Sequence, residues 1–272
     1  GTIIAPFWHP IKLAGESAMT DLITSGRLEL GIARGAYSFE YERLMPGMDA
    51  WEAGQRLREM IPAIRELWKG DYSHEGEFYS FPKSTSTPKP LQQNGPPIWI
   101  AARDPNSHEF AINNSCNVQV TPLWQDYNEV QDLIMKFNSA KKKCNPQSQS
   151  KIMLLQHTYV SDEQNELDEA AKKFSEFYAH FGAWFQNQRP VNQASIKKLS
   201  SKELSLLDMY APEVMKKNLL FGTIDEVTSR LKDYEKLGYD EFSYWIDSGM
   251  SYDEKVSSLN NFIQRVMPAF KS

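Results

Sequence analysis

The feature that most constrains the fold is the alternation of short apolar runs with longer amphipathic segments along most of the chain. Runs typical of β-strands occupy residues 3–5, 28–33, 98–101, 118–121, 152–160 and 242–246. Segments with apolar residues at helical spacing occupy residues 11–23, 51–68, 107–112 and 129–142. Because strands joined by helices pair in parallel through right-handed crossovers, the alternation predicts an α/β fold on a parallel sheet.

The composition is that of an acidic globular protein whose partner is a small molecule. The chain has 272 residues and a net charge of −5, and its acidic and basic residues are interspersed, which argues against a nucleic-acid surface. No apolar run reaches the roughly 20 residues of a membrane span. Cys116 and Cys144 lack metal-ligand spacing and suggest no disulfide framework, so we expect a reducing, cytoplasmic compartment and no metal site.

Helix caps and two long loops give further expectations. A Ser or Thr followed three residues later by Glu or Gln is typical of a capping box, and the pattern occurs at Ser161, Thr223 and Ser251. Residues 71–95 and 187–220 interrupt the alternation. Each is either a surface loop or a wall of the site, since insertions at the mouth of a barrel often cover it.

Two strand ends carry residues suited to an anion. Arg34 and Gly35 follow the run 28–33, and Arg103-Asp104-Pro105-Asn106-Ser107 follows the run 98–101 and leads into a helix. The carboxyl ends of parallel strands share one edge, and free N–H groups at a helix start favour phosphate. The two segments together predict a phosphate cradle. Two alternatives stay open: a salt bridge from Arg34 to Glu40 or Glu42, and a plain N-cap role for Ser107.

Several motifs, in order along the chain, resemble those of the bacterial luciferase-like, flavin-dependent monooxygenases. The stretch GRLELGIARGAYSFEY resembles that family's fourth barrel strand and the loop that meets the flavin phosphate. Four others match in turn: the helix before that strand, the excursion into the fifth strand, the last βα unit and the C-terminal helix. They read HPIKLAGESAMTDLITSGRL, YSHEGEFYSFPKSTSTPKPLQQNGPPIWIAAR, FGTIDEVTSRLKDYEKLGYDEFSYWI and VMPAF.

The resemblance implies a (β/α)8 TIM barrel that binds FMN. Gly1 falls at the family's third strand, so residues 1–272 are expected to form a single barrel domain with strands 3 to 8, with loop insertions at 71–95 and 187–220. The first two βα units, and a family histidine at the end of the second strand, are expected to be absent from this sequence. His9 is interpreted as a helix-start residue, so no catalytic residue is named.

The resemblance also implies roles for individual residues. Arg34 falls where the family's arginine contacts the flavin phosphate, with Ala33 and Ala36 along the flavin edge, and Gly35 lets the backbone pass close to the ligand. Asp104 matches a backbone N–H donor to the phosphate and Ser107 a hydroxyl ligand. Arg103 stands where luciferase has a glutamate and adds a cation, while Trp124 lies near an aromatic wall beside the flavin ring. The candidate cofactor-binding set is Ala33, Arg34, Gly35, Ala36, Arg103, Asp104, Ser107 and Trp124.

The activity implied by the resemblance is oxygenation of a small organic substrate by reduced FMN and O2. A separate NAD(P)H-dependent flavin reductase would supply FMNH2, and the family resemblance together with the aromatic residues of helix 51–68 suggests a homodimer. Two alternatives remain from the sequence. One is hydride transfer with a deazaflavin, and the other is a non-catalytic flavin-binding subunit.

Overall fold

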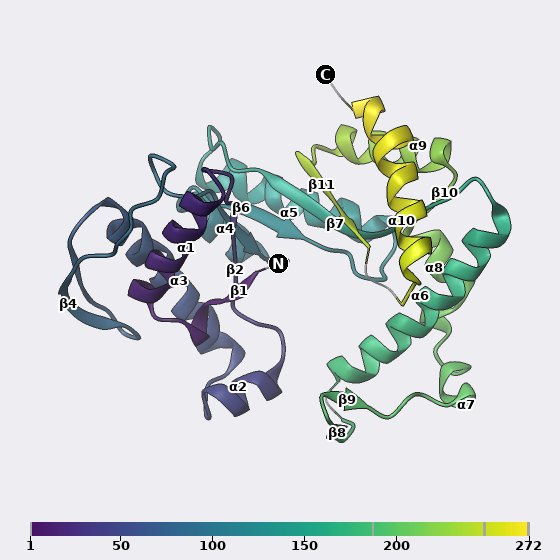
Figure 1. Ribbon diagram of the computed structural model, residues 1–272, viewed down its shortest axis with the longest axis horizontal. Helices are drawn as coiled ribbons and strands as arrows, with labels where there is room; N and C mark the ends of the chain where they lie inside the picture. Colours follow the sequence, from purple (N-terminus) through teal and green to yellow (C-terminus); the bar gives the residue numbers. More distant parts are fainter. Residues whose placement is uncertain (1, 187, 247–248, 271–272) are drawn as a thin grey trace. The chain divides into compact units, whose positions relative to one another are not determined.

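Parallel strands with intervening helices run through most of the computed structural model, which describes residues 2–186, 188–246 and 249–270 (Figure 1). By its internal contacts the chain divides into two units. The first unit comprises residues 1–119 and 136–151, and the second comprises residues 120–135 and 152–272. The α/β class and the parallel pairing expected from the sequence are confirmed, whereas the single barrel domain stays a prediction.

The sheet of the first unit has the order β1-β2-β5-β6, with all neighbours parallel. Its strands are β1 (Ile3–Ile4), β2 (Leu30–Ala33), β5 (Ile98–Ala101) and β6 (Asn117–Val120). The connecting elements are η1 (Ala5–Phe7), α1 (Pro10–Ile23), α2 (Ser38–Leu44), α3 (Ala50–Lys69) and α4 (Pro105–Asn113). Helix α5 (Tyr127–Cys144) belongs partly to each unit.

Helix α3 forms because its apolar residues repeat at helical spacing and its ends are marked in the sequence. Asp49 caps the start by accepting a hydrogen bond from the Glu52 N–H at 2.8 Å, and Gly70 follows the last turn. The expected buried face is confirmed, because Leu57, Ile61, Ile64, Leu67 and Trp68 are all buried. This face packs α3 against α1.

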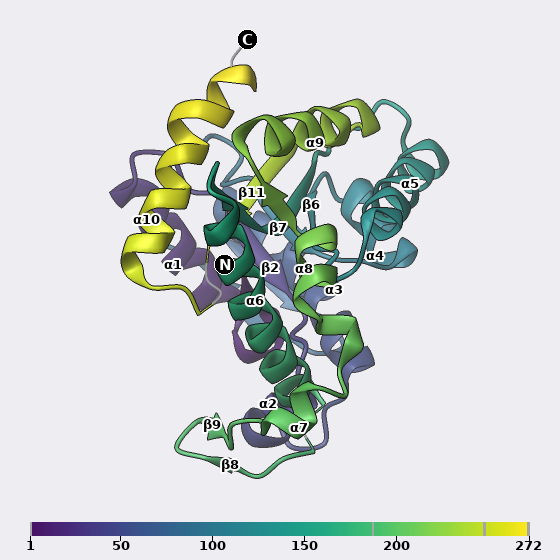
Figure 2. The same cartoon turned by 90° about the vertical axis from the view of Figure 1, so that its right-hand side faces the viewer.

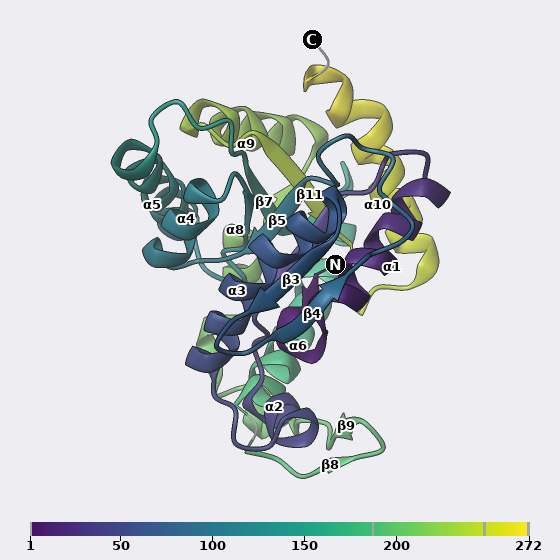
Figure 3. The same cartoon turned by 90° about the vertical axis from the view of Figure 1, so that its left-hand side faces the viewer.

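The segment 71–95, expected as a loop, contains a β-hairpin. Strands β3 (Tyr72–Glu75) and β4 (Ser80–Ser84) pair antiparallel, and the hairpin runs beside α3 in Figure 3. It is attached to α3 through the carboxylate of Glu59, which accepts hydrogen bonds from the backbone N–H groups of its turn. The segment is therefore an ordered addition to the first unit.

The second unit is built around the long strand β7. Strand β7 (Ile152–Val160) pairs in parallel with β10 (Leu220–Gly222) and with β11 (Glu241–Trp245). The helices of this unit are α6 (Gln164–Phe185), α7 (Ser201–Leu204), η2 (Asp208–Tyr210), α8 (Pro212–Asn218), α9 (Ile224–Leu237) and α10 (Tyr252–Asn261), followed by η3 (Phe262–Val266) and η4 (Met267–Phe270). A small hairpin joins β8 (Val191–Asn192) to β9 (Ser195–Ile196). Figure 2 shows α8 lying along α6.

Two expectations about the second unit need correction. Leu220, placed in the loop insertion, begins strand β10, because the insertion ends before this short buried run. The capping box at Ser161 is also wrong: α6 starts at Gln164 after Glu163, and the Ser161 hydroxyl donates to Glu166 at 2.7 Å. The boxes at Thr223 and Ser251 are confirmed.

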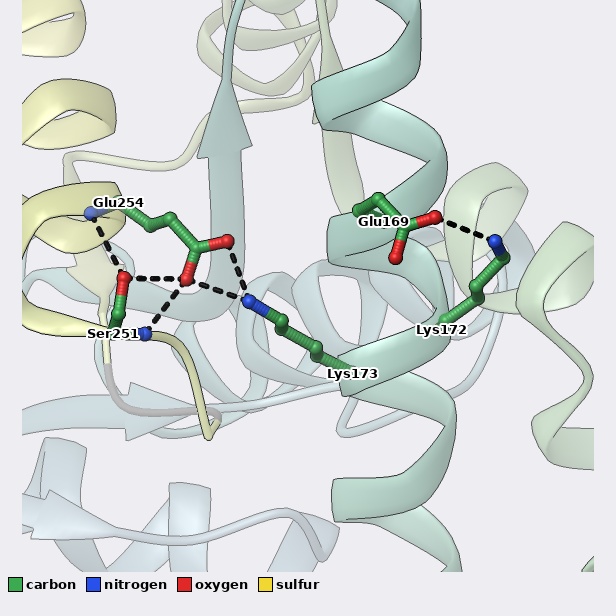
Figure 4. A network of polar contacts seen from close by, with 5 residues as sticks. All are labelled: Glu169, Lys172, Lys173, Ser251 and Glu254. Carbon is green, nitrogen blue, oxygen red and sulfur yellow. Dashed lines mark hydrogen bonds and ion pairs between the residues drawn. The ribbon is translucent and has the colours of Figure 1, made fainter.

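The capping box of α10 extends into a cross-helix ion pair. Glu254 accepts hydrogen bonds from the N–H and hydroxyl of Ser251, and Lys173 of α6 lies 2.5 Å from the same carboxylate (Figure 4). The hydrogen bonds from Lys173 and Ser251 lower the pKa of Glu254 to about 2 despite partial burial. This contact ties the start of α10 to α6.

Candidate functional site

The carboxyl ends of β2 and β5 bring the two predicted anion-binding segments to one edge of the first unit. The strands are parallel neighbours, with Ile32 opposite Ile100. Arg34 lies two residues beyond Ile32, and Arg103 lies three residues beyond Ile100. Both loops therefore leave the sheet from the same side, as the sequence predicted.

Arg34 is held by contacts that leave its charge uncompensated. Its Nη1 donates to the carbonyl of Ala50 at 3.0 Å, and its own carbonyl accepts the hydroxyl proton of Tyr41 at 2.9 Å. The side chain is exposed, and no carboxylate of the described residues forms an ion pair with it. The alternative of a salt bridge to Glu40 or Glu42 is thus not what the structure shows. An exposed, oriented guanidinium without a carboxylate partner suits a phosphate.

Gly35 is required by its conformation and by its neighbours. Its φ is +98°, in the region where side chains are strained. A Cβ there would lie 3.0 Å from both Ile4 Cγ2 and the Tyr41 hydroxyl. Two alanines lie near it. Ala33, at the end of β2, is half-buried, and Ala36, in the loop, is exposed. The glycine therefore allows the chain to turn tightly between Arg34 and α2.

At the other strand end, the residue that caps α4 is Asp104. Its carboxylate accepts a hydrogen bond from the Ser107 N–H at 2.9 Å, and Pro105 occupies the first helical position. Burial disfavours the charged form of Asp104, but the hydrogen bonds from Ser107 outweigh it and lower the pKa. The plain N-cap alternative for Ser107 is therefore wrong. The Asp104 carboxylate would itself repel a phosphate, so cations at this edge have to compensate for it.

His108 is a residue of this edge that the sequence reasoning missed. Its ring is buried, and Nε2 lies 3.1 Å from the carbonyl of Ala102, the residue after β5. Burial lowers its pKa, so the imidazole is neutral at pH 7 and donates from Nε2 to that carbonyl. The bond ties α4 to the end of β5. Its position directly after Ser107, on the helix side facing the strand, is the signal that could have identified it.

Trp124 belongs to the second unit. Its ring packs edge-on against Tyr178 and Tyr210, with centroids 5.9 and 5.3 Å away, and its carbonyl accepts a hydrogen bond from Asn218 at 3.0 Å. The other seven candidate residues, Ala33, Arg34, Gly35, Ala36, Arg103, Asp104 and Ser107, all belong to the first unit. The structure therefore groups seven of the eight predicted residues at one sheet edge.

Trp124 adjoins a buried aromatic cluster around His157. The Nδ1 of His157 lies 2.6 Å from the Tyr178 hydroxyl, and its ring stacks on Trp245 at 3.8 Å. These rings are held by packing between β7, β11 and α6. No group of three or more potential metal ligands lies together within the described ranges. None of the helices in those ranges is long and apolar enough to cross a membrane.

Comparison with known proteins decides which family carries this arrangement. The family model for luciferase-like monooxygenases matches residues 1–241. The chain belongs to that family. It is 61% identical over 270 residues to the flavin-dependent trigonelline monooxygenase, oxygenase component, of Acinetobacter baylyi, a match covering 99% of this chain and 75% of the relative. Because of this identity and the family match, the chain is a flavin-dependent monooxygenase and therefore an enzyme.

Solved structures agree with the family assignment. Monooxygenase RslO1 from Streptomyces bottropensis superposes with a TM-score of 0.76 at 25% identity, covering 100% of this chain and 77% of that one. The oxygenating constituent of 3,6-diketocamphane monooxygenase from Pseudomonas putida, in complex with FMN, gives a TM-score of 0.72 at 17% identity, with coverages of 98% and 78%. The second likeness shows a shared fold alone. The luciferase-like fold expected from the motifs is confirmed.

Proposed function

We propose that this chain is the oxygenase component of a two-component system that uses FMNH2 and O2 to oxygenate trigonelline. The observation that carries the proposal is the 61% identity, over 99% of the chain, to an oxygenase component named for that substrate. A protein described as an oxygenase component requires a second component, so a separate flavin reductase is the partner. The same identity favours oxygenation over the alternatives of deazaflavin-dependent hydride transfer and non-catalytic flavin binding.

The carboxyl edge of β2 and β5 is our proposal for the flavin phosphate site. The fit rests on Arg34, whose guanidinium is oriented by Ala50 yet has no carboxylate partner among the described residues. Ser107 and the start of α4 would add neutral donors, and Arg103 a second cation against the charge of Asp104. The flavin role of Trp124, which belongs to the second unit, stays a prediction.

The protein's own contribution is binding and orientation. FMN supplies the oxygen chemistry when it is bound in reduced form. Arg34 fixes one end of the cofactor by its charge, and Tyr41 holds the Arg34 backbone through its hydroxyl. Because a phosphate anchored at one end limits where the flavin ring can lie, the anchor also sets where the substrate must bind.

We also propose a cytoplasmic homodimer. The support for a dimer is Trp51 at the start of α3, whose side chain is 67% exposed although large aromatic side chains gain most from burial. Sedimentation velocity at several protein concentrations tests this point. A monomer at the highest concentration contradicts it, and Trp51→Ser is expected to weaken association without unfolding the chain.

Turnover with isotopic oxygen tests the function. The protein is mixed with trigonelline, FMN, NADH and a flavin reductase under ¹⁸O2, and the product is analysed by mass spectrometry. One ¹⁸O atom is expected in the product, and none when the reductase is omitted. Oxygenation of other N-methylpyridinium compounds but not trigonelline overturns the substrate assignment. Substrate oxidation without ¹⁸O, coupled to the reduction of an oxidised deazaflavin, overturns the reaction type.

A further inference from the structure

A cavity of about 460 Å³ lies at the amino end of β5, away from the loops that follow the strand. Its walls come from the last turns of α3, the segment from Lys89 to Ile98 and Ser115 in the loop before β6. Pro97 and Ile98 stand at the beginning of the strand, whereas Arg103 and Asp104 follow its end. The cavity is therefore separate from the proposed flavin site, and its role does not depend on the proposed function.

The charges that line this cavity are all positive. They are Arg65, Lys69 and Lys89, and the lining, which lies wholly within the described residues, includes no Asp or Glu. Lys69 pairs with Glu66 outside the lining at 2.6 Å. Arg65 and Lys89 are half-buried and form no ion pair with any carboxylate of the described chain. Arg65 thus faces the cavity without an acidic partner, and Lys89 has only the long-range attraction of the exposed carboxylate of Asp71.

The partners of Arg65 and Lys89 orient the two side chains without neutralising them. Arg65 donates to the carbonyls of Asn114 and Ser115, the latter at 3.1 Å, and to the Sγ of Cys116 at 3.4 Å. Lys89 Nζ donates to the carbonyl of Leu67 at 2.8 Å. These carbonyls belong to the C-terminal ends of α4 and α3, each of which carries roughly half a negative charge. Because partial charges are weaker than a carboxylate, the lining keeps a net positive charge for an anion.

The uncharged part of the lining is mixed, with Gln92, Gln93, Asn94 and Ser115 as polar residues beside an apolar surface. Trp68, Pro90, Pro96, Pro97 and Ile98 supply this surface. The loop backbone lies directly on the indole, since a Cβ at Gly95 would stand 2.1 Å from the Trp68 ring, and Gly95 has a φ of +80°. A wall fixed in this way is preformed for a planar ligand.

We propose that this cavity binds a small aromatic carboxylate, with the carboxylate at Arg65 and Lys89 and the ring against the proline-rich wall. A guanidinium can pair with both oxygens of a carboxylate. A simple inorganic anion satisfies the charge but leaves the apolar wall uncovered. A neutral aromatic amide covers the wall but leaves the two cations without a partner.

Titration calorimetry at low ionic strength tests the proposal with three probes: benzoate, benzamide and inorganic phosphate. Benzoate is expected to bind at least about tenfold more tightly than either of the others. Benzamide lacks the charge-assisted hydrogen bond, and phosphate lacks the buried ring. Arg65→Gln is expected to weaken benzoate binding by about tenfold or more. Lys83→Gln, which removes an exposed lysine outside the lining, is expected to leave it unchanged.

A second variant covers the possibility that Arg65→Gln disturbs folding. Asn94→Asp adds a carboxylate to the lining with almost no change in shape, and it is expected to weaken benzoate by a similar factor. Asn138→Asp makes the same charge change on the exposed side of α5 and serves as its control. Arg34→Ala is expected to have no effect, which separates this cavity from the flavin site.

Three results overturn the proposal. They are no measurable benzoate binding, benzoate binding that neither Arg65→Gln nor Asn94→Asp weakens, and phosphate binding as tightly as benzoate. The first would mean that Arg65 and Lys89 serve only to hold the ends of α4 and α3. The third would replace the aromatic carboxylate with a general anion.

Discussion

Replacement of Glu59 by glutamine is expected to detach the β3–β4 hairpin from α3. The Glu59 side chain is 15% exposed, and its carboxylate accepts four hydrogen bonds. The donors are the N–H groups of Glu77, Phe78 and Tyr79, at 3.1, 3.0 and 2.9 Å, and Nε2 of His74 at 2.9 Å. A turn with this many N–H groups directed at one carboxylate depends on that carboxylate for its hydrogen bonding.

The size of the effect follows from the donors that lose their acceptor. In the wild-type protein the N–H groups of Glu77 and Phe78 both donate to Oε2 of Glu59. Glutamine keeps one oxygen, but its NH2 group would replace Oε2 and cannot accept these hydrogen bonds. The N–H of Glu77 is exposed and can bond to water, whereas a buried N–H without an acceptor costs about 1–3 kcal/mol. Because the N–H of Phe78 is partly buried, the free energy of opening the hairpin is expected to fall by about 1–3 kcal/mol.

The pH dependence of this effect has a definite sign. Burial raises the pKa of Glu59, but the N–H groups of Phe78 and Tyr79 and the hydrogen bond from His74 outweigh it, so the pKa is lowered. The ionised carboxylate thus stabilises the protein above the unfolded-state pKa of about 4.3, and the stabilisation is lost as the pH falls below that value. The difference between wild type and Glu59→Gln should shrink over the same range.

Hydrogen exchange at the amides of Phe78 and Tyr79, together with urea unfolding, measures the effect. Glu75→Gln changes an exposed glutamate in the same hairpin and is the matched control. Unchanged exchange rates in Glu59→Gln, with a stability change below about 0.5 kcal/mol, would show that the carboxylate does not hold the hairpin.

Two further substitutions probe other contacts. Glu254→Gln removes the partner of Lys173 and Ser251 (Figure 4); because the pair is partly exposed, a loss of about 1 kcal/mol is expected at pH 7. The loss should vanish as the pH falls from about 4.3 towards about 2, and a difference constant with pH in urea unfolding would refute this assignment. Tyr41→Phe removes the hydroxyl that donates to the Arg34 carbonyl and is expected to cost about 0.5–1.5 kcal/mol in urea unfolding. A variant as stable as wild type would contradict that role.

The parts of the fold that the sequence predicted well are those with strong local signals. Strand β5 was predicted to the residue because Pro96 and Pro97 mark its start, and β7 because seven of its nine residues are apolar, aromatic or β-branched. Strand β10 was missed because three residues carry no periodicity and only their pairing with β7 identifies them. The hairpin β3–β4 was missed for a related reason, since a tertiary contact to Glu59 holds it.

The candidate site shows the same division between local and tertiary information. Arg34 and the α4 start could be predicted because parallel strands place their carboxyl ends together. An N-cap role for Ser107 was kept open as an alternative, although proline at the first helical position points to Asp104 as the cap. At Ser161 the capping-box pattern was present, but Glu166 competed for the hydroxyl. The fixing of Arg34 by Ala50 and Tyr41 depends on tertiary folding and has no local signal.

The affinities of Arg34→Ala for FMN and for riboflavin test most directly the claim that the edge of β2 and β5 binds the flavin phosphate. The substitution removes a charge-assisted hydrogen bond worth about 1.5–3 kcal/mol, so FMN binding is expected to weaken roughly ten- to more than hundredfold. Riboflavin lacks the phosphate, and its binding to the folded variant is expected to stay unchanged. A variant that keeps the wild-type preference for FMN over riboflavin would contradict the claim.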